Sequence, residues 1–482
     1  MSEELVHRAV ERAGQKGCEY AEARWQRTDD LVCYIRNGEA EPTQIASAEG
    51  IGIRVVLDGE LAFGATNLLT AGSLDELTDR LVKNARAASN TMKGGKIRLS
   101  KERANTAKWV AEEKKKADDV SVESMISFLK EIDTTLKNPI SEVSFPNRNL
   151  ILGRSVEEKY FENSDGSRLE SRIPRFFYLG MMVGMYQGRP SSISVPPGYC
   201  GLGGTGGWEI IEALNLQSRI PDGARQAVIG IKASNKPPVG ETLDVILGPN
   251  VAGLTSHESC GHPGEADRIL GREGAQAGES FLKANTLGME IGSSEAYVSD
   301  DPTIPHSMGF YLYDDEGVKA RKRNLITAGK FTEFLQNRET ASYFGIESNG
   351  SSRAVQFDRE PIIRMGNTFI EPGDWTFEEM LKDIRRGVYI KSFMEWNIDD
   401  KRLNQRYAGL EAYSIENGAL GEPIKEPIFE ITTPKYWGSI DARGRDLEYY
   451  CGTCGKGDPM QGAPVFFGSP HIRLRGVRVS AR

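Results

Sequence analysis

The segment His257-Glu258-Ser259-Cys260-Gly261-His262-Pro263 constrains the local fold of this chain more than any other part of its sequence. Residues 243–247 are typical of a strand, and Gly248-Pro249-Asn250 is typical of a turn whose proline begins a helix, so we expect the segment to be helical. Five residues turn a regular α-helix through about 500°, which leaves the two imidazoles roughly 140° apart. Gly261 tolerates unusual dihedral angles, and Pro263 disfavours the α conformation at His262 and lacks a backbone N–H. We therefore predict a π-bulge or a helix break at residues 261–263, which lets both histidines reach one ion.

The composition indicates a folded protein with two or three domains. The chain has 482 residues, of which 39% are hydrophobic and 27% charged, and its formal net charge is −8. This negative charge argues against binding to nucleic acid or to an anionic membrane surface. The longest nearly apolar run, residues 176–186, is too short to span a bilayer, and the charged, amphipathic amino terminus does not resemble a secretory signal. Six dispersed cysteines suggest no disulfide framework, so we expect a cytoplasmic protein with no membrane partner.

Residues 1–235 are predicted to form an α/β domain with an antiparallel sheet and packed helices. An opening helix is followed by hairpin signals at Asn37-Gly38 and Asp58-Gly59. Ser73 and Glu76 form a capping-box pattern before an amphipathic helix, and residues 125–136 carry a second apolar helical stripe. Two extended stretches flank residues 163–166, and they continue the β pattern.

Two further segments of this half have unusual composition. Residues 101–119 are dense in charges of both signs, which indicates a solvated helix or linker. Residues 191–207 are rich in glycine, proline and serine, which indicates a hinge. The hinge contains a formal GxGxxG at residues 201–206, but Pro196-Pro197-Gly198 precedes it where a dinucleotide-binding motif needs a buried strand, so nucleotide binding is disfavoured.

Residues 236–482 are predicted to form a second, mainly β domain that carries the histidine-containing helix. The fold class expected for the whole chain is therefore α+β. A His-Glu-x-x-x-His pattern is unusual in a chain with five histidines, and a catalytic zinc ion needs a third protein ligand with the fourth position left for water. The candidates for this ligand are Cys451, Cys454, His306, His471, Glu265 and Asp267.

Cys454 is the favoured third ligand, because a thiolate binds zinc strongly and residues 452–457 are predicted to form a glycine-rich turn that approaches another segment closely. Cys451 leaves a closed Cys₂His₂ structural site open as an alternative. Glu258 argues for catalysis, because a carboxylate beside a metal-binding histidine is the group that takes a proton from activated water. A redox pair of the two cysteines is disfavoured, since the βαβ context is absent.

Several blocks of the carboxyl-terminal half together resemble the TldD/PmbA family of metallopeptidases. They are residues 257–267, Asp314-Asp315-Glu316-Gly317, residues 325–330, residues 364–368, Glu411-Ala412-Tyr413 and Cys454-Gly455-Lys456. The resemblance covers most of residues 236–465, and the amino-terminal half fits more loosely. It implies the motif-bearing TldD type, with Zn²⁺ on His257, His262 and Cys454, Glu258 as the catalytic acid and base, and no role for Cys451.

The resemblance also implies a two-domain subunit that works as a homodimer, or as a heterodimer with a PmbA-like paralogue, on short or unfolded peptides. The chain departs from the family at residues 393–400, where a Gly-Gly-x-x-Asp-Pro stretch is usual, so its substrate preference is expected to differ. Glu265 and Asp267 are predicted either to orient the ligand histidines or to form surface salt bridges.

The predicted function is that of a zinc-dependent peptidase. Two alternatives stay open at this point. One is a non-catalytic assembly or binding protein with a structural zinc site. The other is a zinc amidase or deacylase, because the same activation of water serves any amide.

Overall fold

The computed structural model describes residues 2–91, 95–197, 201–275 and 277–481. Within these ranges the protein is a mixed α+β fold with three large sheets and a two-stranded ribbon, as the sequence predicts at the level of fold class. The elements of the first half are α1 (Ser2–Gln15), β1 (Tyr20–Arg36), β2 (Glu39–Ala40), β3 (Gln44–Leu57), β4 (Glu60–Thr66), α2 (Ala71–Thr91), β5 (Thr106–Val110), η1 (Ala117–Asp119), α3 (Val122–Thr135), β6 (Ser144–Asn163), β7 (Arg168–Tyr186), β8 (Arg189–Ser194), β9 (Leu202–Thr205), α4 (Glu209–Ala213) and α5 (Leu216–Lys232).

The second half contains more and shorter elements. Its helices are α6 (Pro249–Ser256), η2 (His257–Gly261), α7 (Ala266–Ile269), η3 (Ala284–Thr286), α8 (Arg338–Phe344), α9 (Phe377–Lys382) and α10 (Thr433–Ser439). Its strands are β10 (Glu241–Leu247), β11 (Val298–Asp300), β12 (Arg323–Thr327), β13 (Lys330–Phe331), β14 (Ser352–Arg353), β15 (Ile362–Ile363), β16 (Asn367–Ile370), β17 (Arg386–Ile390), β18 (Phe393–Ile398), β19 (Asn404–Gly409), β20 (Ala412–Glu416), β21 (Ala419–Pro423), β22 (Pro427–Thr432), β23 (Ile440–Arg443), β24 (Glu448–Lys456), β25 (Gln461–Ser469) and β26 (Ile472–Ala481).

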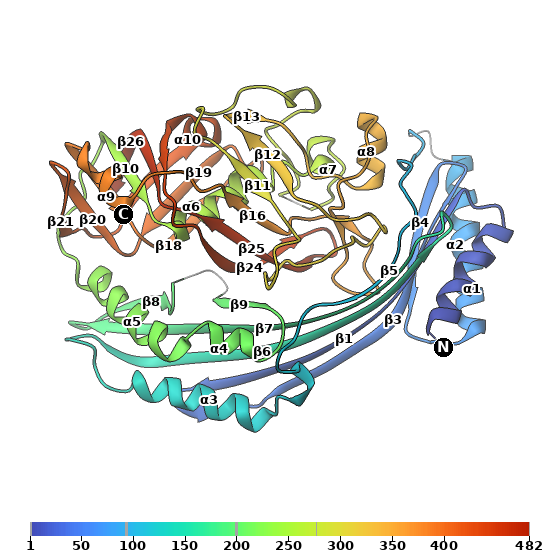
Figure 1. The fold of residues 1–482 in the computed structure, drawn as a ribbon, viewed down its shortest axis with the longest axis horizontal. Helices are drawn as coiled ribbons and strands as arrows, with labels where there is room; N and C mark the ends of the chain where they lie inside the picture. The colour runs from blue at the N-terminus through green and yellow to red at the C-terminus, as the bar shows by residue number, and fades with distance from the viewer. Residues whose placement is uncertain (1, 92–94, 198–200, 276, 482) are drawn as a thin grey trace.

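The first half is built on one long, curved sheet with the strand order β4-β3-β1-β6-β7-β5. Its neighbours are antiparallel except for β5, which runs parallel to β7. The predicted turns at Asn37-Gly38 and Asp58-Gly59 are confirmed, because all four residues have positive φ, as tight hairpins require. Figure 1 shows the second half of the chain on the concave side of this sheet, with α3 on the opposite side and α1 and α2 at one end.

The predicted helices of this half are present, with one shifted start. Helix α2 begins at Ala71, before the expected capping box, because Thr70 Oγ1 accepts the Ser73 amide at 3.2 Å and caps the helix instead. The apolar stripe expected over residues 125–136 is confirmed in α3, where Met125, Leu129 and Ile132 are buried against the sheet.

Two segments that composition marked as irregular contain strands. Residues 101–119, expected to be a solvated helix or linker, contain β5, which pairs with β7. The segment 191–207, predicted to be a hinge, contributes β8 and β9 to the same sheet, and its residues 198–200 lie outside the described residues. Gly203 of the GxGxxG pattern lies within β9. A Cβ at this position would lie 2.3 Å from the Phe176 carbonyl oxygen, so a glycine is needed for β9 to pack closely against β7.

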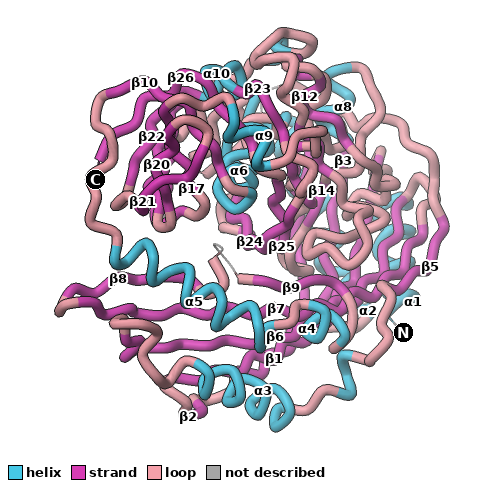
Figure 2. Tube along the Cα trace, turned by 60° about the vertical axis from the view of Figure 1, so that its left-hand side comes forward, coloured by secondary structure: helices cyan, strands magenta, loops and turns pink. Residues whose placement is uncertain are grey.

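The second half packs a sheet of order β18-β19-β22-β26-β10-β17-β20-β21 near a smaller sheet of order β13-β12-β11-β16-β25-β24. One large apolar core joins residues of both sheets and of α6, among them Val245, Leu254, Cys260 and Phe467. Figures 1 and 2 show α6 among these strands, above the curved sheet. No helix of the described residues is long and apolar enough to cross a membrane.

Candidate metal centre

The motif segment forms the irregular helix that its spacing predicts. Helix α6 continues into a π-helical turn at His257–Gly261, in which the His262 amide donates to the carbonyl of His257, five residues earlier, at 3.1 Å. The predicted π-bulge is therefore present, but at residues 257–261 rather than at residues 261–263. One extra residue in the turn brings both imidazoles to the same side, with their ring centroids 4.9 Å apart.

The π-helical turn does not arise from unusual dihedral angles at His262 or Gly261, contrary to what the sequence suggested. His262 keeps helical dihedrals, φ −59° and ψ −49°, although a proline follows it. Pro263 acts through its missing N–H: the Ser259 carbonyl, four residues earlier, accepts the Trp437 indole N–H at 3.2 Å instead. Gly261 is needed for space, since a Cβ there would lie 1.9 Å from the sulfur of Met365.

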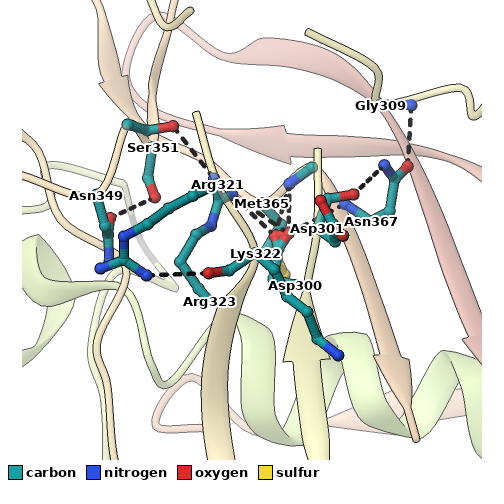
Figure 3. Close-up of polar contacts among 12 residues, drawn as sticks. Asp300, Asp301, Gly309, Arg321, Lys322, Arg323, Asn349, Ser351, Met365 and Asn367 are labelled. Carbon is teal, nitrogen blue, oxygen red and sulfur yellow. Dashed lines mark hydrogen bonds and ion pairs between the residues drawn. The ribbon is translucent and has the colours of Figure 1, made fainter. Parts of the chain in front are cut away.

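Asp300 holds the backbone that follows Met365, and Figure 3 shows the two residues close together. This fully buried carboxylate accepts the amides of Gly366 and Asn367 at 2.9 and 3.0 Å and the Arg323 guanidinium at 3.1 Å. Breaking a buried, hydrogen-bonded pair of this kind is costly, so the start of β16 is held firmly against the motif.

Cys454 completes a buried cluster with the two motif histidines. One ligand atom from each of His257, His262 and Cys454 lies within 4.8 Å of the others, and Cys454 Sγ is 3.4 Å from His262 Nε2. Cys454 comes from β24, which is the edge strand of the smaller sheet among the described residues. The expected glycine-rich turn at residues 452–457 is thus wrong, because this segment is a regular strand up to Lys456.

Three other candidate ligands, Cys451, His306 and His471, lie outside the cluster. Successive residues of a strand face opposite sides, so Cys451, three residues before Cys454, points away from it. His306 bonds the Thr205 carbonyl oxygen at 3.1 Å, where the two halves of the chain meet. His471 bonds the Tyr389 hydroxyl at 2.9 Å. Among the described residues, the group suited to a metal ion is therefore His257, His262 and Cys454.

The surroundings of the cluster favour the protonation states that metal ligands need. Burial lowers the pKa of His257 and of His262, which keeps both imidazoles neutral. Burial alone would raise the pKa of Cys454, but its contact with His262 Nε2 and the nearby Arg364 guanidinium outweigh burial and bring this pKa to about 7. Cys260, inside the motif, differs, since burial raises its pKa well above the usual value.

Glu265 holds His262, and a buried charge network holds Glu265. The Glu265 carboxylate lies 3.0 Å from His262 Nδ1, which directs Nε2 of the ring toward the cluster. Burial opposes ionisation of Glu265, but Lys456 and Arg268 lower its pKa well below the ordinary value. Asp267 binds Lys456 at 2.7 Å rather than a histidine, so it acts on the cluster through that lysine.

Glu258 lies on the π-turn next to the first histidine and pairs with a residue from a distant hairpin. Its Oε2 accepts Arg402 Nη1 at 2.6 Å. The neighbouring Ser259 donates to Gln405 Oε1 at 2.5 Å, so the turn before β19 and the start of that strand hold two successive residues of the motif. Arg402 was missed by the sequence analysis. One feature of the sequence could have pointed to Arg402: it lies just after residues 393–400, where the chain departs from the family pattern.

Two neutral imidazoles, a thiol of lowered pKa and an adjacent glutamate in one buried site form the donor set of a metal-dependent hydrolase. Family models agree: the PmbA/TldA metallopeptidase domain 1 matches residues 21–85, the central domain residues 115–236, and the C-terminal domain residues 240–481. The chain belongs to the PmbA/TldD family of metallopeptidases, and it is a metalloprotease.

Individual relatives are similar over between half and nearly all of the chain. A metalloprotease from Methanothermobacter thermautotrophicus is 28% identical over 467 residues, which cover 96% of this chain and 95% of that protein. A zinc metalloprotease TldD homolog from Saccharolobus solfataricus is 31% identical over 266 residues, 55% of each chain. A metalloprotease TldD homolog from Haemophilus influenzae is 23% identical and covers 96% of this chain and 93% of its own.

Solved structures share the fold. TldE from Thermococcus kodakarensis superposes with a TM-score of 0.76 at 16% identity, covering 99% of this chain and all of its own. A Thermotoga maritima protein described as a putative modulator of a DNA gyrase gives a TM-score of 0.77 at 19% identity, with coverage of 99% and 100%. At these identities the likeness concerns the fold alone.

Proposed function

We propose that this metalloprotease is a zinc-dependent peptidase that cleaves short or unfolded polypeptides, with His257, His262 and Cys454 as zinc ligands and Glu258 as general base. The observation that carries the proposal is the approach of three buried donor atoms to within 4.8 Å, with Glu258 adjacent to the first ligand. One curated relative is itself described as a zinc metalloprotease.

The residues at this site fit zinc. Nitrogen and sulfur donors in tetrahedral zinc sites lie roughly 3.5 Å from one another, which is close to the 3.4 Å between Cys454 Sγ and His262 Nε2. Nδ1 of His257 is buried and has no hydrogen-bond partner among the described residues, a costly state that coordination of a metal ion by this nitrogen would relieve. Three protein ligands leave one position for water or substrate, as catalytic zinc sites do.

Glu258 moves the proton in this scheme. Bound zinc supplies Lewis acidity, which makes water acidic enough to lose a proton near neutral pH. Since Oε2 of Glu258 is taken by Arg402, Oε1 accepts the proton from the attacking water. The same carboxyl group then gives this proton to the leaving amine nitrogen as the C–N bond breaks.

An extended peptide suits the surroundings of the cluster. Cys454 lies on β24, an edge strand among the described residues, on which Thr453 and Gly455 are exposed. A peptide that adds to a sheet edge as a further strand is recognised through its backbone more than through its side chains. We expect low sequence selectivity toward unfolded chains. We also expect a homodimer or a heterodimer with a PmbA-like paralogue, to be tested by light scattering with and without that partner.

The alternatives fit the site less well. A closed structural zinc site needs Cys451, which faces away from the cluster. It also gives no reason for a buried Glu258 beside a ligand. An amidase or deacylase uses the same chemistry, so assays on peptides and on small N-acyl amides decide between substrate classes.

The substitution Glu258→Gln tests the proposal. The variant should keep about one zinc per chain and hydrolyse an unfolded, fluorescently labelled protein at least about 100-fold more slowly, because the amide removes the proton acceptor. The matched control is Glu430→Gln, at a carboxylate whose side chain is 65% exposed on β22. Full activity of the Glu258 variant would disprove the assigned role. A protein that unfolds on chelation and shows no activity beforehand would instead support a structural metal.

A further inference from the structure

Arg402 is a partly buried cation beside the candidate metal centre, and its hydrogen-bonding capacity is incompletely used. Its Nη1 donates to Glu258 Oε2 at 2.6 Å, and the two side chains are 11% and 6% exposed. Its Nε is buried and has no acceptor among the described residues. A buried donor without an acceptor is costly, so a group that binds here during function is expected to supply one.

The turn that carries Arg402 is strongly constrained. The Asp399 side chain accepts the amides of Leu403 and Asn404 at 2.7 and 3.1 Å, and the Asp399 carbonyl accepts the Arg402 amide at 2.9 Å. Arg402 itself has a φ of +61°, which a non-glycine residue rarely adopts. Such a constrained backbone holds the guanidinium in place before substrate binds.

Contacts from outside the hairpin fix the same turn. Thr433 Oγ1 donates to the Arg402 carbonyl at 2.7 Å, and the Phe281 amide donates to the Lys401 carbonyl at 2.8 Å. The turn is therefore tied to two other segments of the fold. A fixed donor loses little conformational entropy when it binds a developing charge, which is the condition for effective electrostatic catalysis.

Other cations near the cluster contact groups other than Glu258. Lys456 and Arg268 bind the carboxylates of Glu265 and Asp267 on the side of His262. Arg364 donates to the backbone carbonyls of Cys454 and Gln461. Arg402 is the cation that contacts Glu258, the proposed general base, so it lies where the reacting amide must meet that base.

We propose that Arg402 is a catalytic residue of the peptidase reaction, in which Nη1 orients Glu258 and the remaining N–H donors bind the carbonyl oxygen of the scissile amide. This inference rests on the function proposed above. As the water oxygen forms its bond to the carbonyl carbon, the π electrons move onto the carbonyl oxygen, and Arg402 stabilises the resulting negative charge without losing a proton. The C–N bond then breaks, and the amine leaves with the proton held by Glu258.

The test compares Arg402→Gln and Arg402→Lys with wild type in steady-state kinetics on a fluorogenic peptide. Because the donors act on the transition state, Arg402→Gln should lower kcat and kcat/KM together by about 100-fold, with zinc content and thermal unfolding unchanged. Arg402→Lys, which keeps the charge but not the planar set of donors, should retain about a tenth of wild-type kcat. The matched control is Arg406→Gln on the same hairpin, whose side chain is 34% exposed and pairs with Glu395 and Glu430; it should leave kcat within twofold.

A double-mutant cycle separates the two contacts of Arg402. In a Glu258→Gln background, Arg402→Gln should lower the residual rate by a further tenfold or more, because the contact with the carbonyl oxygen persists there. No further loss would overturn the proposed carbonyl contact, and an unchanged or increased kcat in the single variant would overturn the proposal entirely. If Arg402→Gln does not fold, Arg402→Lys decides: kcat equal to wild type refutes the proposal. Absence of peptidase activity in zinc-loaded wild type would instead refute the proposed function.

Discussion

Lys456 offers the sharpest test of how the buried network supports the candidate metal centre. Its side chain is fully buried on β24, two residues after Cys454. The ammonium donates to both Asp267 oxygens at 2.8 and 2.7 Å and to the Ile363 carbonyl at 2.8 Å. Glu265 lies 3.3 Å away and Glu273 3.5 Å away. One cation thus compensates three carboxylates inside the protein.

The substitution Lys456→Met removes this charge while keeping a side chain of similar length. Of the three carboxylates, Glu265 then keeps its pair with Arg268 at 2.6 Å, and the loss of one partner of a buried ion pair costs about 3–5 kcal/mol. We expect a decrease of this size in the free energy of unfolding, measured by urea denaturation of zinc-free protein. The matched control Lys401→Met, at a lysine whose side chain is 61% exposed and 3.5 Å from Glu279, should change stability by less than about 0.5 kcal/mol.

The decrease should also depend on pH with a defined sign. Burial already raises the pKa of Asp267 despite the opposing effect of Lys456, and loss of the lysine raises this pKa further. A carboxyl group with a raised pKa in the folded state favours folding below its unfolded pKa and loses that contribution as the pH rises through the folded value. The penalty of Lys456→Met should therefore be smaller at pH 4 than at pH 7. A penalty under about 1 kcal/mol, or one independent of pH, would refute this reasoning.

Three further substitutions test neighbouring parts of the site. Gly261→Ala places a Cβ 1.9 Å from Met365 Sδ, so urea denaturation should show a loss of about 1–3 kcal/mol, and unchanged stability would contradict the packing argument. Glu265→Gln weakens the hydrogen bond that orients the second motif histidine, so zinc affinity measured by chelator competition should fall about 10–100-fold, and an unchanged affinity would argue against an orienting role. Cys451→Ser should keep about one zinc per chain by metal analysis, because this residue faces away from the cluster; loss of zinc would revive the closed Cys₂His₂ site.

The local features of the fold were largely predictable. The turns at Asn37-Gly38 and Asp58-Gly59 follow from residues that adopt positive φ, and α3 follows from its apolar stripe. The composition of residues 101–119 suggested a solvated helix or linker, but the charges flank β5, which has one charged side chain, Lys108, and pairs with β7. Strand pairing depends on a partner that is distant in sequence, and charge density does not reveal it.

In the candidate site too, one feature was predictable from local sequence and others were not. The five-residue spacing of His257 and His262 by itself determined that the helix had to deform, because helical geometry is a local property. The tertiary structure alone decided which cysteine faces the histidines and which cation meets Glu258. Cys454 reaches His262 across 192 residues and Arg402 reaches Glu258 across 144. Such contacts depend on strand register and on the packing of sheets against α6, which no local pattern in the sequence specifies.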